Sequence, residues 1–94
     1  MAAFELLLHD ASTLKQKRGV VRPLVSELQR RFGVAASETD HHDLYRRTQL
    51  GVAVVSGRAG HCTEVLDTVE RWLAGRPEAD LIGTQRQLRS IDDE

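Results

Sequence analysis

The sequence of 94 residues is poor in aromatic residues, at 4% of the chain, and has a single cysteine, Cys62. One cysteine cannot form a disulfide within the chain, so we expect a cytoplasmic protein. With so few aromatic side chains, the surface cannot stack several nucleic-acid bases in succession. No apolar run approaches the roughly 20 residues of a membrane helix. The first residues also lack the basic start of a signal peptide, so no membrane contact is expected.

A strong excess of charge of one sign is also absent. The chain has 13 basic and 14 acidic residues, for a net charge of −1. This balance argues against a protein that binds nucleic acid over its whole surface, and it leaves room only for a local basic patch. Hydrophobic residues make up 40% and charged residues 29% of the chain, an ordinary globular composition. We expect one domain over residues 1–94, with a disordered acidic tail at about 91–94.

Motifs for catalysis and cofactor binding are likewise missing. The sequence has no P-loop, no glycine-rich dinucleotide turn and no zinc-ligand spacing. His41 and His42 lie between two aspartates, which we interpret as a polar hairpin tip, with a metal or small-molecule sensor as a distant alternative. Cys62 falls on an apolar helical stripe and is predicted to be a buried small hydrophobe. We therefore expect no enzyme activity, no cofactor and no metal site.

Two segments have helical periodicity. Between Leu14 and Phe32 the apolar residues recur at spacings of three and four, which predicts an amphipathic helix. Thr13 stands three residues before Gln16 in the pattern of a capping box, and Gly33 is placed to end the helix. A second apolar stripe runs from residue 62 to residue 73 and is followed by glycine and proline, which predicts a second helix.

Four extended segments surround these helices: residues 4–8, 34–39, 50–55 and, more weakly, 81–88. The order β-α-β-β-α-β is that of ferredoxin-like domains. Right-handed crossovers then predict an α+β fold, with a four-stranded antiparallel sheet in the order 4-1-3-2 and both helices on one face. In this topology the start of the first helix lies beside the turn between the second and third strands.

The first helix is rich in basic residues. Residues 15–31 contain six bases and one acid, Glu27. Four of these residues share one outward arc of the helix, opposite Leu24 and Leu28: Lys15, Arg18, Arg22 and Arg30. Basic side chains near a helix N-terminus are repelled by the positive end of the helix dipole. They therefore suggest an anionic partner such as a phosphate backbone or an acidic surface. An ordinary solvated helix face is the alternative.

Lys17 differs from these bases because it falls on the apolar side of the helix. One interpretation is a salt bridge to Asp40 or Asp43 in the hairpin. The other is contact between its ammonium group and a ligand.

The third strand and the turn before it carry an aromatic residue next to two arginines. Tyr45 and Arg47 are expected on the sheet face without helices, and Arg46 on the opposite side. An aromatic beside an arginine on an open sheet is a weak indication of RNA binding. The rest of that face is small and mildly apolar, which suits packing against a partner or a second copy equally well.

Seven runs and one histidine carry a recognisable pattern: residues 12–18, 20–21, 27–32, 43–47, 50–56, 64–67 and 76–78, with His61. Together they are similar to the YlxP-like family of small bacterial proteins of unknown function. The resemblance covers nearly the whole chain. It implies a ferredoxin-like fold and a role in ribosome maturation, because members typically lie in gene neighbourhoods with translation initiation factor two and ribosome-binding factor A. It provides no catalytic residues.

We therefore expect a non-enzymatic accessory factor that contacts ribosomal RNA or the small ribosomal subunit. The residues expected to bind RNA are Lys15, Lys17, Arg18, Arg22, Tyr45, Arg46 and Arg47. The alternative is a protein-interaction or homodimerisation module that uses the open sheet face and does not bind RNA directly.

Overall fold

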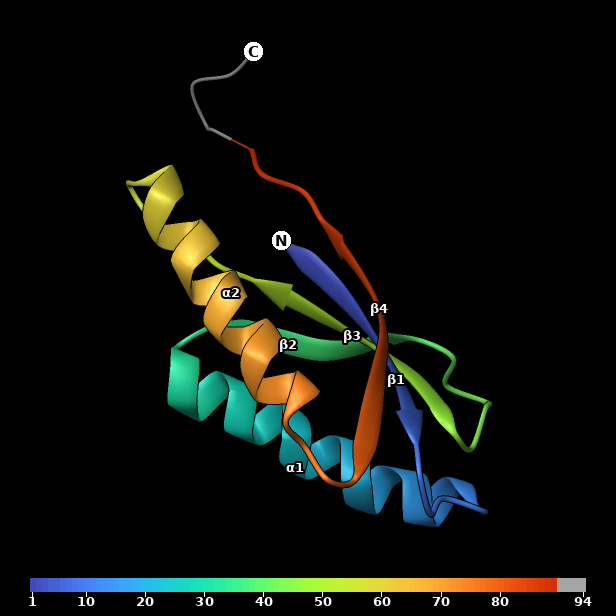
Figure 1. Ribbon diagram of the computed structural model, residues 1–94. Coiled ribbons are helices and arrows are strands. Elements are labelled where there is room, and N and C mark those ends of the chain that lie inside the picture. The colour runs from blue at the N-terminus through green and yellow to red at the C-terminus, as the bar shows by residue number, and fades with distance from the viewer. Residues whose placement is uncertain (90–94) are drawn as a thin grey trace.

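The computed structural model describes residues 1–89 and has the predicted ferredoxin-like α+β fold (Figure 1). Its elements are β1 (Ala2–Leu8), α1 (Leu14–Phe32), β2 (Ala35–Asp40), β3 (Arg47–Ala53), α2 (Ala59–Ala74) and β4 (Ala79–Arg86). The strands are antiparallel and lie in the order β2-β3-β1-β4, which is the predicted order read from the other edge. The tail predicted at residues 91–94 lies outside the described residues.

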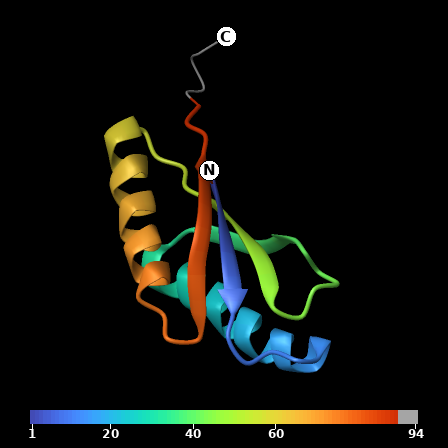
Figure 2. The same cartoon turned by 45° about the vertical axis from the view of Figure 1, so that its right-hand side comes forward.

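One face of the sheet carries the core. Along β1 the side chains alternate strictly, with Phe4, Leu6 and Leu8 almost fully buried. On β3 the buried positions are Thr48, Leu50 and Val52, as the period of two requires. Both helices cover this face (Figure 2), and the core residues that they supply are Val21, Leu24 and Leu28 of α1 and Leu66, Val69 and Leu73 of α2.

Helix α1 begins and ends where the sequence predicts. The Thr13 hydroxyl accepts a hydrogen bond from the Gln16 amide at 3.1 Å, and the Gln16 side chain accepts one from the Ser12 amide at 2.8 Å. This reciprocal pattern is a capping box displaced by one residue, and it satisfies backbone donors that the first turn leaves unpaired. At the other end Gly33 has φ of 62°, a left-handed conformation that glycine adopts without steric cost.

The strand boundaries differ from those read off the apolar runs. Strand β3 begins at Arg47, before the predicted residue 50, and stops at Ala53, so Val55 is outside the sheet and 92% exposed. The early start reflects pairing with β1, where Arg47 faces Leu7 and Gln49 faces Glu5. A ladder of backbone hydrogen bonds defines a strand, and polar side chains on its solvent face do not interrupt it. No helix within residues 1–89 has both the length and the apolar character to cross a membrane.

Candidate functional site

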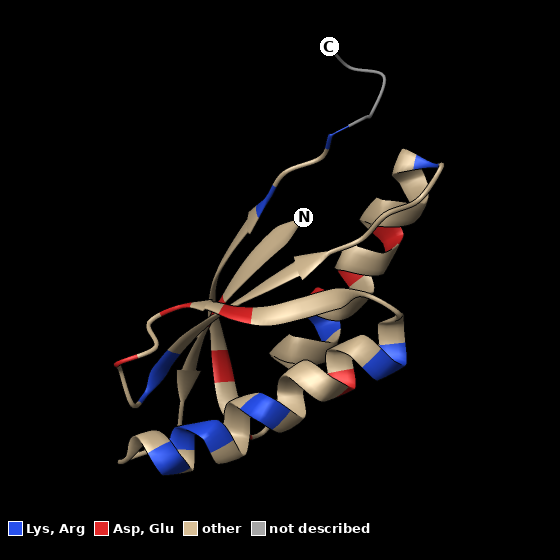
Figure 3. Cartoon of the chain, turned by 180° about the vertical axis from the view of Figure 1, so that it is seen from behind, with Lys and Arg blue, Asp and Glu red and all other residues tan. Residues whose placement is uncertain are grey.

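Three basic side chains form an exposed ridge along the first two turns of α1. We name this surface, made of Lys15, Arg18 and Arg22, the α1 ridge; all three residues are exposed. None of the three forms an ion pair with any residue in the described part of the chain. The first turn of α1 also contains no acidic residue. Figure 3 shows these basic segments following one another along the N-terminal half of the helix.

The basic residues at the other end of α1 have an intramolecular partner. Arg30 and Arg31 both contact the carboxylate of Glu27, the latter at 2.6 Å. The hydrogen bond from Arg31 is the main reason that the pKa of Glu27 lies below its usual value. The basic residues in the last turn of α1 thus have an acidic partner, whereas those of the α1 ridge have none within residues 1–89.

Lys17 points away from the ridge and into the protein. It is 2% exposed, and its ammonium lies 2.9 Å from Oε2 of Glu38 and donates to the carbonyl of His41. The partner is therefore Glu38 and not Asp40 or Asp43, the two acids considered from the sequence. Thr48 donates to the same carboxylate oxygen at 2.6 Å.

Burial acts to raise the pKa of Glu38, but the hydrogen bonds from Thr48 and Lys17 outweigh it and hold the pKa below its usual value. Glu38 is therefore held in its ionised form opposite the Lys17 ammonium. This ion pair occupies Lys17 within the fold, so we do not include Lys17 in the proposed binding surface.

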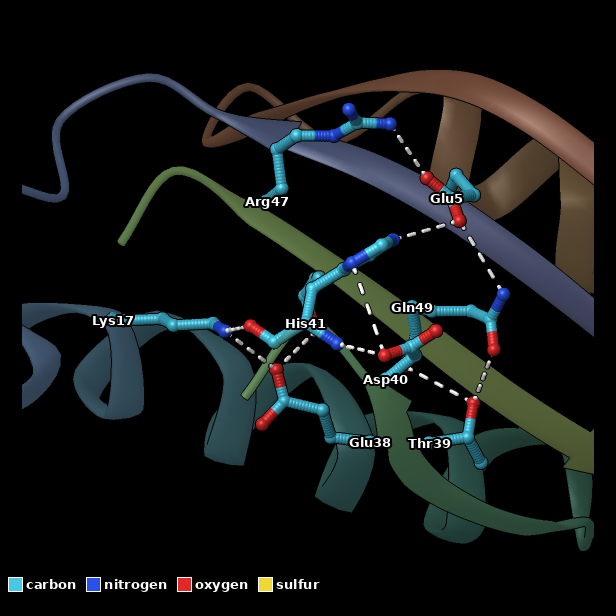
Figure 4. A network of polar contacts seen from close by, with 9 residues as sticks. Glu5, Lys17, Glu38, Thr39, Asp40, His41, Arg47 and Gln49 are labelled. Carbon is cyan, nitrogen blue, oxygen red and sulfur yellow. Dashed lines mark hydrogen bonds and ion pairs between the residues drawn. The ribbon is translucent and has the colours of Figure 1, made fainter. Parts of the chain in front are cut away.

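The loop between β2 and β3 links the two faces of the sheet (Figure 4). His41 has φ of 63°, an uncommon value for a residue other than glycine. Its carbonyl accepts a hydrogen bond from Lys17 on the helix-covered face of the sheet. Its ring Nε2 lies 2.9 Å from Oε1 of Glu5 on the face without helices. Glu5 also receives hydrogen bonds from Arg47 at 2.9 Å and Gln49 at 3.3 Å. These contacts hold the loop in its left-handed turn.

The hydrogen bond with His41 is the largest influence on Glu5. It lowers the pKa of the Glu5 carboxyl, partial burial opposes it, and the hydrogen bond from Arg47 adds to the lowering. Glu5 is thus an acceptor for two basic side chains on the face without helices.

Two arginines expected to bind RNA are engaged within the fold. Arg46 donates hydrogen bonds to the backbone carbonyls of Leu8 at 3.3 Å and His9 at 3.1 Å. It thus satisfies two backbone acceptors at the C-terminal end of β1. Arg47 pairs with Glu5 on the open face, as described above. Tyr45 lies in the loop and is 49% exposed. The residues expected from the sequence therefore divide into the exposed α1 ridge with Tyr45, and an internally bonded group of Lys17, Arg46 and Arg47.

A groove of about 650 Å³ lies between α1 and β2, beside the ridge. Leu14, Val21, Val25 and Ala36 supply its apolar lining, and Arg18 and Arg22 also line it. This groove was not predicted from the sequence. The available signal was the strand order, because β2 is an edge strand and no further strand covers the apolar arc of α1 beyond it.

The open face of the sheet is partly charged and partly small. A shallow depression there is lined by Ala3, Glu5, Arg47, Gln49, Gly83 and Thr84, among others, with Ile82 49% exposed beside them. The network around Glu5 thus occupies part of the face for which the sequence left both RNA contact and packing against a partner open. Within residues 1–89, no group of three or more His, Cys, Asp or Glu side chains is arranged to hold a metal ion.

Comparison with known proteins gives two matches. Residues 1–86 match the family described as "Protein of unknown function (DUF503)". The chain is also 32% identical over 79 residues to "Uncharacterized protein YlxP" of Bacillus subtilis (strain 168), which covers 84% of this chain and 86% of that protein. Agreement over nearly the full length of both chains accords with the resemblance noted from the sequence motifs. The chain is therefore a member of the DUF503 family, to which its similarity to YlxP also points.

Proposed function

We propose that this protein is a non-enzymatic accessory factor that binds RNA through the α1 ridge, and that its target is ribosomal RNA or the small ribosomal subunit. The observation that carries the proposal is that Lys15, Arg18 and Arg22 are exposed and form no ion pair in residues 1–89, whereas Lys17 and the two arginines at the end of α1 are paired. A surface that keeps three neighbouring positive charges uncompensated attracts a polyanion.

The position of the ridge on the helix strengthens this argument. The N-terminus of a helix carries a partial positive charge, so Lys15 and Arg18 are placed where their own charge is least favourable for the helix. An anion bound there interacts favourably with both the side chains and the helix dipole. The phosphate groups of a nucleic-acid backbone occur at regular intervals. They therefore match the row of Lys and Arg side chains along α1 better than an isolated carboxylate does.

The ribosomal setting comes from the family. YlxP-like proteins typically lie in gene neighbourhoods with translation initiation factor two and ribosome-binding factor A, as noted above. The absence of aromatic stacking platforms fits a protein that binds mainly through phosphates rather than by reading a long sequence.

Homodimerisation through the open sheet face is the second candidate function. Ile82 is 49% exposed in a depression that also contains Ala3 and Gly83, and a second copy of the chain could cover these residues. The charged side chains of Glu5 and Arg47 in the same depression count against burial of this face.

Sedimentation of cell lysate through sucrose gradients separates the two functions. We expect the wild-type protein to sediment with ribosomal particles at low salt and to leave them at high salt. The variant Lys15→Glu/Arg18→Glu/Arg22→Glu should stay at the top of the gradient at both salt concentrations.

A matched control makes the same change of net charge elsewhere. Arg58, Arg71 and Arg89 are exposed and lie outside α1, so Arg58→Glu/Arg71→Glu/Arg89→Glu should sediment like the wild type. Co-sedimentation of the ridge variant with ribosomes would contradict the proposal. A dimer of the purified protein whose stability does not depend on salt would favour the second function.

A further inference from the structure

The groove between α1 and β2 has the size and lining of a ligand site. Its volume of about 650 Å³ falls within the range of about 300–1,000 Å³ for small-molecule pockets. Leu14, Val21, Val25 and Ala36 supply the apolar part of its lining. The other lining residues are polar or charged: Lys17, Arg18, Arg22, Ser26, Ser37, Glu38, His42 and Asp43. Such a mixed lining suits a flat organic ring that packs against the apolar side chains and carries polar substituents for the groups around them.

The groove and the α1 ridge share two residues. Arg18 and Arg22 belong to the ridge and also line the groove. An RNA strand whose phosphates contact these arginines therefore has its bases within reach of the apolar lining. A base in a duplex is stacked and paired and cannot enter, whereas single-stranded RNA can turn a base out of the stack.

Glu38 supplies the polar group that would orient such a base. Its Oε2 atom accepts hydrogen bonds from Lys17 and Thr48, but no hydrogen bond or ion pair within the described chain involves Oε1. Figure 4 shows this second oxygen turned away from the network. Glu38 is among the residues that line the groove, with 20% of its side chain exposed. A carboxylate oxygen there repels phosphate and accepts an N–H group.

From these three features we infer that the groove holds one unstacked nucleobase bearing an exocyclic amino group, which donates to Glu38 while neighbouring phosphates contact Arg18 and Arg22. Carboxylates are known acceptors for the amino group of cytosine. Uracil fits this environment poorly, because its one imino donor lies between two carbonyl oxygens that the carboxylate repels. The inference rests on the proposed RNA-binding function and adds the kind of RNA: single-stranded, with cytosine preferred over uracil.

Binding of labelled RNA octamers to the purified protein tests the inference. We expect oligo(C) to bind roughly tenfold more tightly than oligo(U), the size of one well-formed base contact. A duplex of the same length should bind no more tightly than oligo(U), because it reaches only the ridge. Equal affinity for the two octamers would overturn the inference.

A variant that fills the groove provides the second measurement. Ser26 lines the groove and is exposed, so Ser26→Trp should leave the fold intact while it blocks entry of a base. We expect this variant to lose roughly tenfold in affinity for oligo(C) and nothing for oligo(U). Ala74→Trp places the same side chain at an exposed position on α2 and should change neither affinity.

The outcomes separate the inference from the function on which it rests. If the octamers bind equally, Ser26→Trp has no effect and the ridge variant abolishes binding, the base site is wrong and the proposed function stands. If no octamer binds to the folded wild-type protein, both are overturned. A loss for Ser26→Trp that is the same for oligo(C) and oligo(U) also overturns the base site, because the groove would then not distinguish the bases.

Discussion

The Lys17 ammonium lies 2.9 Å from Oε2 of Glu38, and only 3% of the Lys17 side chain is exposed. This ion pair joins α1 to the edge strand β2, and both of its residues line the groove. It also explains how one basic residue of the N-terminal half of α1 is accommodated without an external anion, while its neighbours on the α1 ridge are not.

The variant Lys17→Met is expected to be less stable than the wild type. Methionine fills a similar volume, but it leaves the carboxylate of Glu38 without its ammonium partner. Removal of one partner of a fully buried pair costs about 3–5 kcal/mol, and access of water to Glu38 reduces the expected loss here to about 2 kcal/mol. Urea denaturation measures the free energy of unfolding.

The double variant Lys17→Met/Glu38→Gln is the control for this pair. Glutamine keeps an oxygen that can accept the hydrogen bond from Thr48 and removes the unpaired charge. We expect it to recover part of the stability that Lys17→Met loses. Additive losses from the two single changes would show that the pair makes no energetic contribution.

We expect the free energy of unfolding to fall as the pH rises above neutrality, because of His9 at the end of the sheet. His9 Nε2 lies 3.0 Å from Asp80, and Nδ1 lies 2.9 Å from the carbonyl oxygen of Pro77. Both ring nitrogens face acceptors, so the protonated ring is favoured, and the hydrogen bond to Asp80 is the main cause of the raised pKa of His9. The stabilisation is complete below the unfolded pKa of about 6.5 and is lost as the pH rises through the higher folded value.

An NMR titration of the imidazole resonances checks the direction of this shift. The pKa of His9 should lie above the ordinary histidine value of about 6.5. The variant His9→Gln should lose the decline in urea midpoint above pH 6.5. A pKa of His9 at or below that ordinary value would refute the assignment.

Gly51 is expected to tolerate no larger side chain while Thr39 is present. A Cβ atom on Gly51 would lie 2.6 Å from the methyl group of Thr39 on the neighbouring strand. Rotation of that methyl would break the hydrogen bond between Thr39 Oγ1 and Gln49 at 2.9 Å. We expect Gly51→Ala to reduce the free energy of unfolding by about 1 kcal/mol.

Gly51→Ala/Thr39→Ser tests the cause of this loss. Serine removes the methyl group and keeps the hydroxyl, so the double variant should regain most of the stability. If Gly51→Ala is as stable as the wild type in thermal denaturation, close approach of the two strands is not the reason for glycine at this position.

The fold could be predicted because local signals agreed along the chain. Thr13 and Gln16 indicated the start of α1, Gly33 its end, and the apolar periodicity its buried face. The element order then restricted the topology to one arrangement. The apolar run marked only the part of β3 from residue 50 onward. The expectation that Arg47 lies on the open face is confirmed by its pairing with Glu5, but the exact start of the strand depends on pairing with β1 rather than on hydrophobicity.

The candidate site could be predicted only in part. The outward arc of Lys15, Arg18 and Arg22 follows from helical geometry. The predicted partner of Lys17 was wrong. Asp40 and Asp43 were chosen because the topology places the loop between the second and third strands beside the start of the first helix. The alternation of β2, in which Glu38 shares the helix-facing side with Ala36, indicated the correct acid. The groove depends on how α1 packs against β2, which no local sequence pattern encodes.

The salt dependence of RNA binding by the purified protein tests the central claim most directly. Three phosphates neutralised on single-stranded RNA give a slope of log affinity against log salt of about −2. The variant Lys15→Gln/Arg18→Gln/Arg22→Gln should lose this slope, and Arg58→Gln/Arg71→Gln/Arg89→Gln should retain it. An unchanged slope and affinity in the first variant would contradict the account.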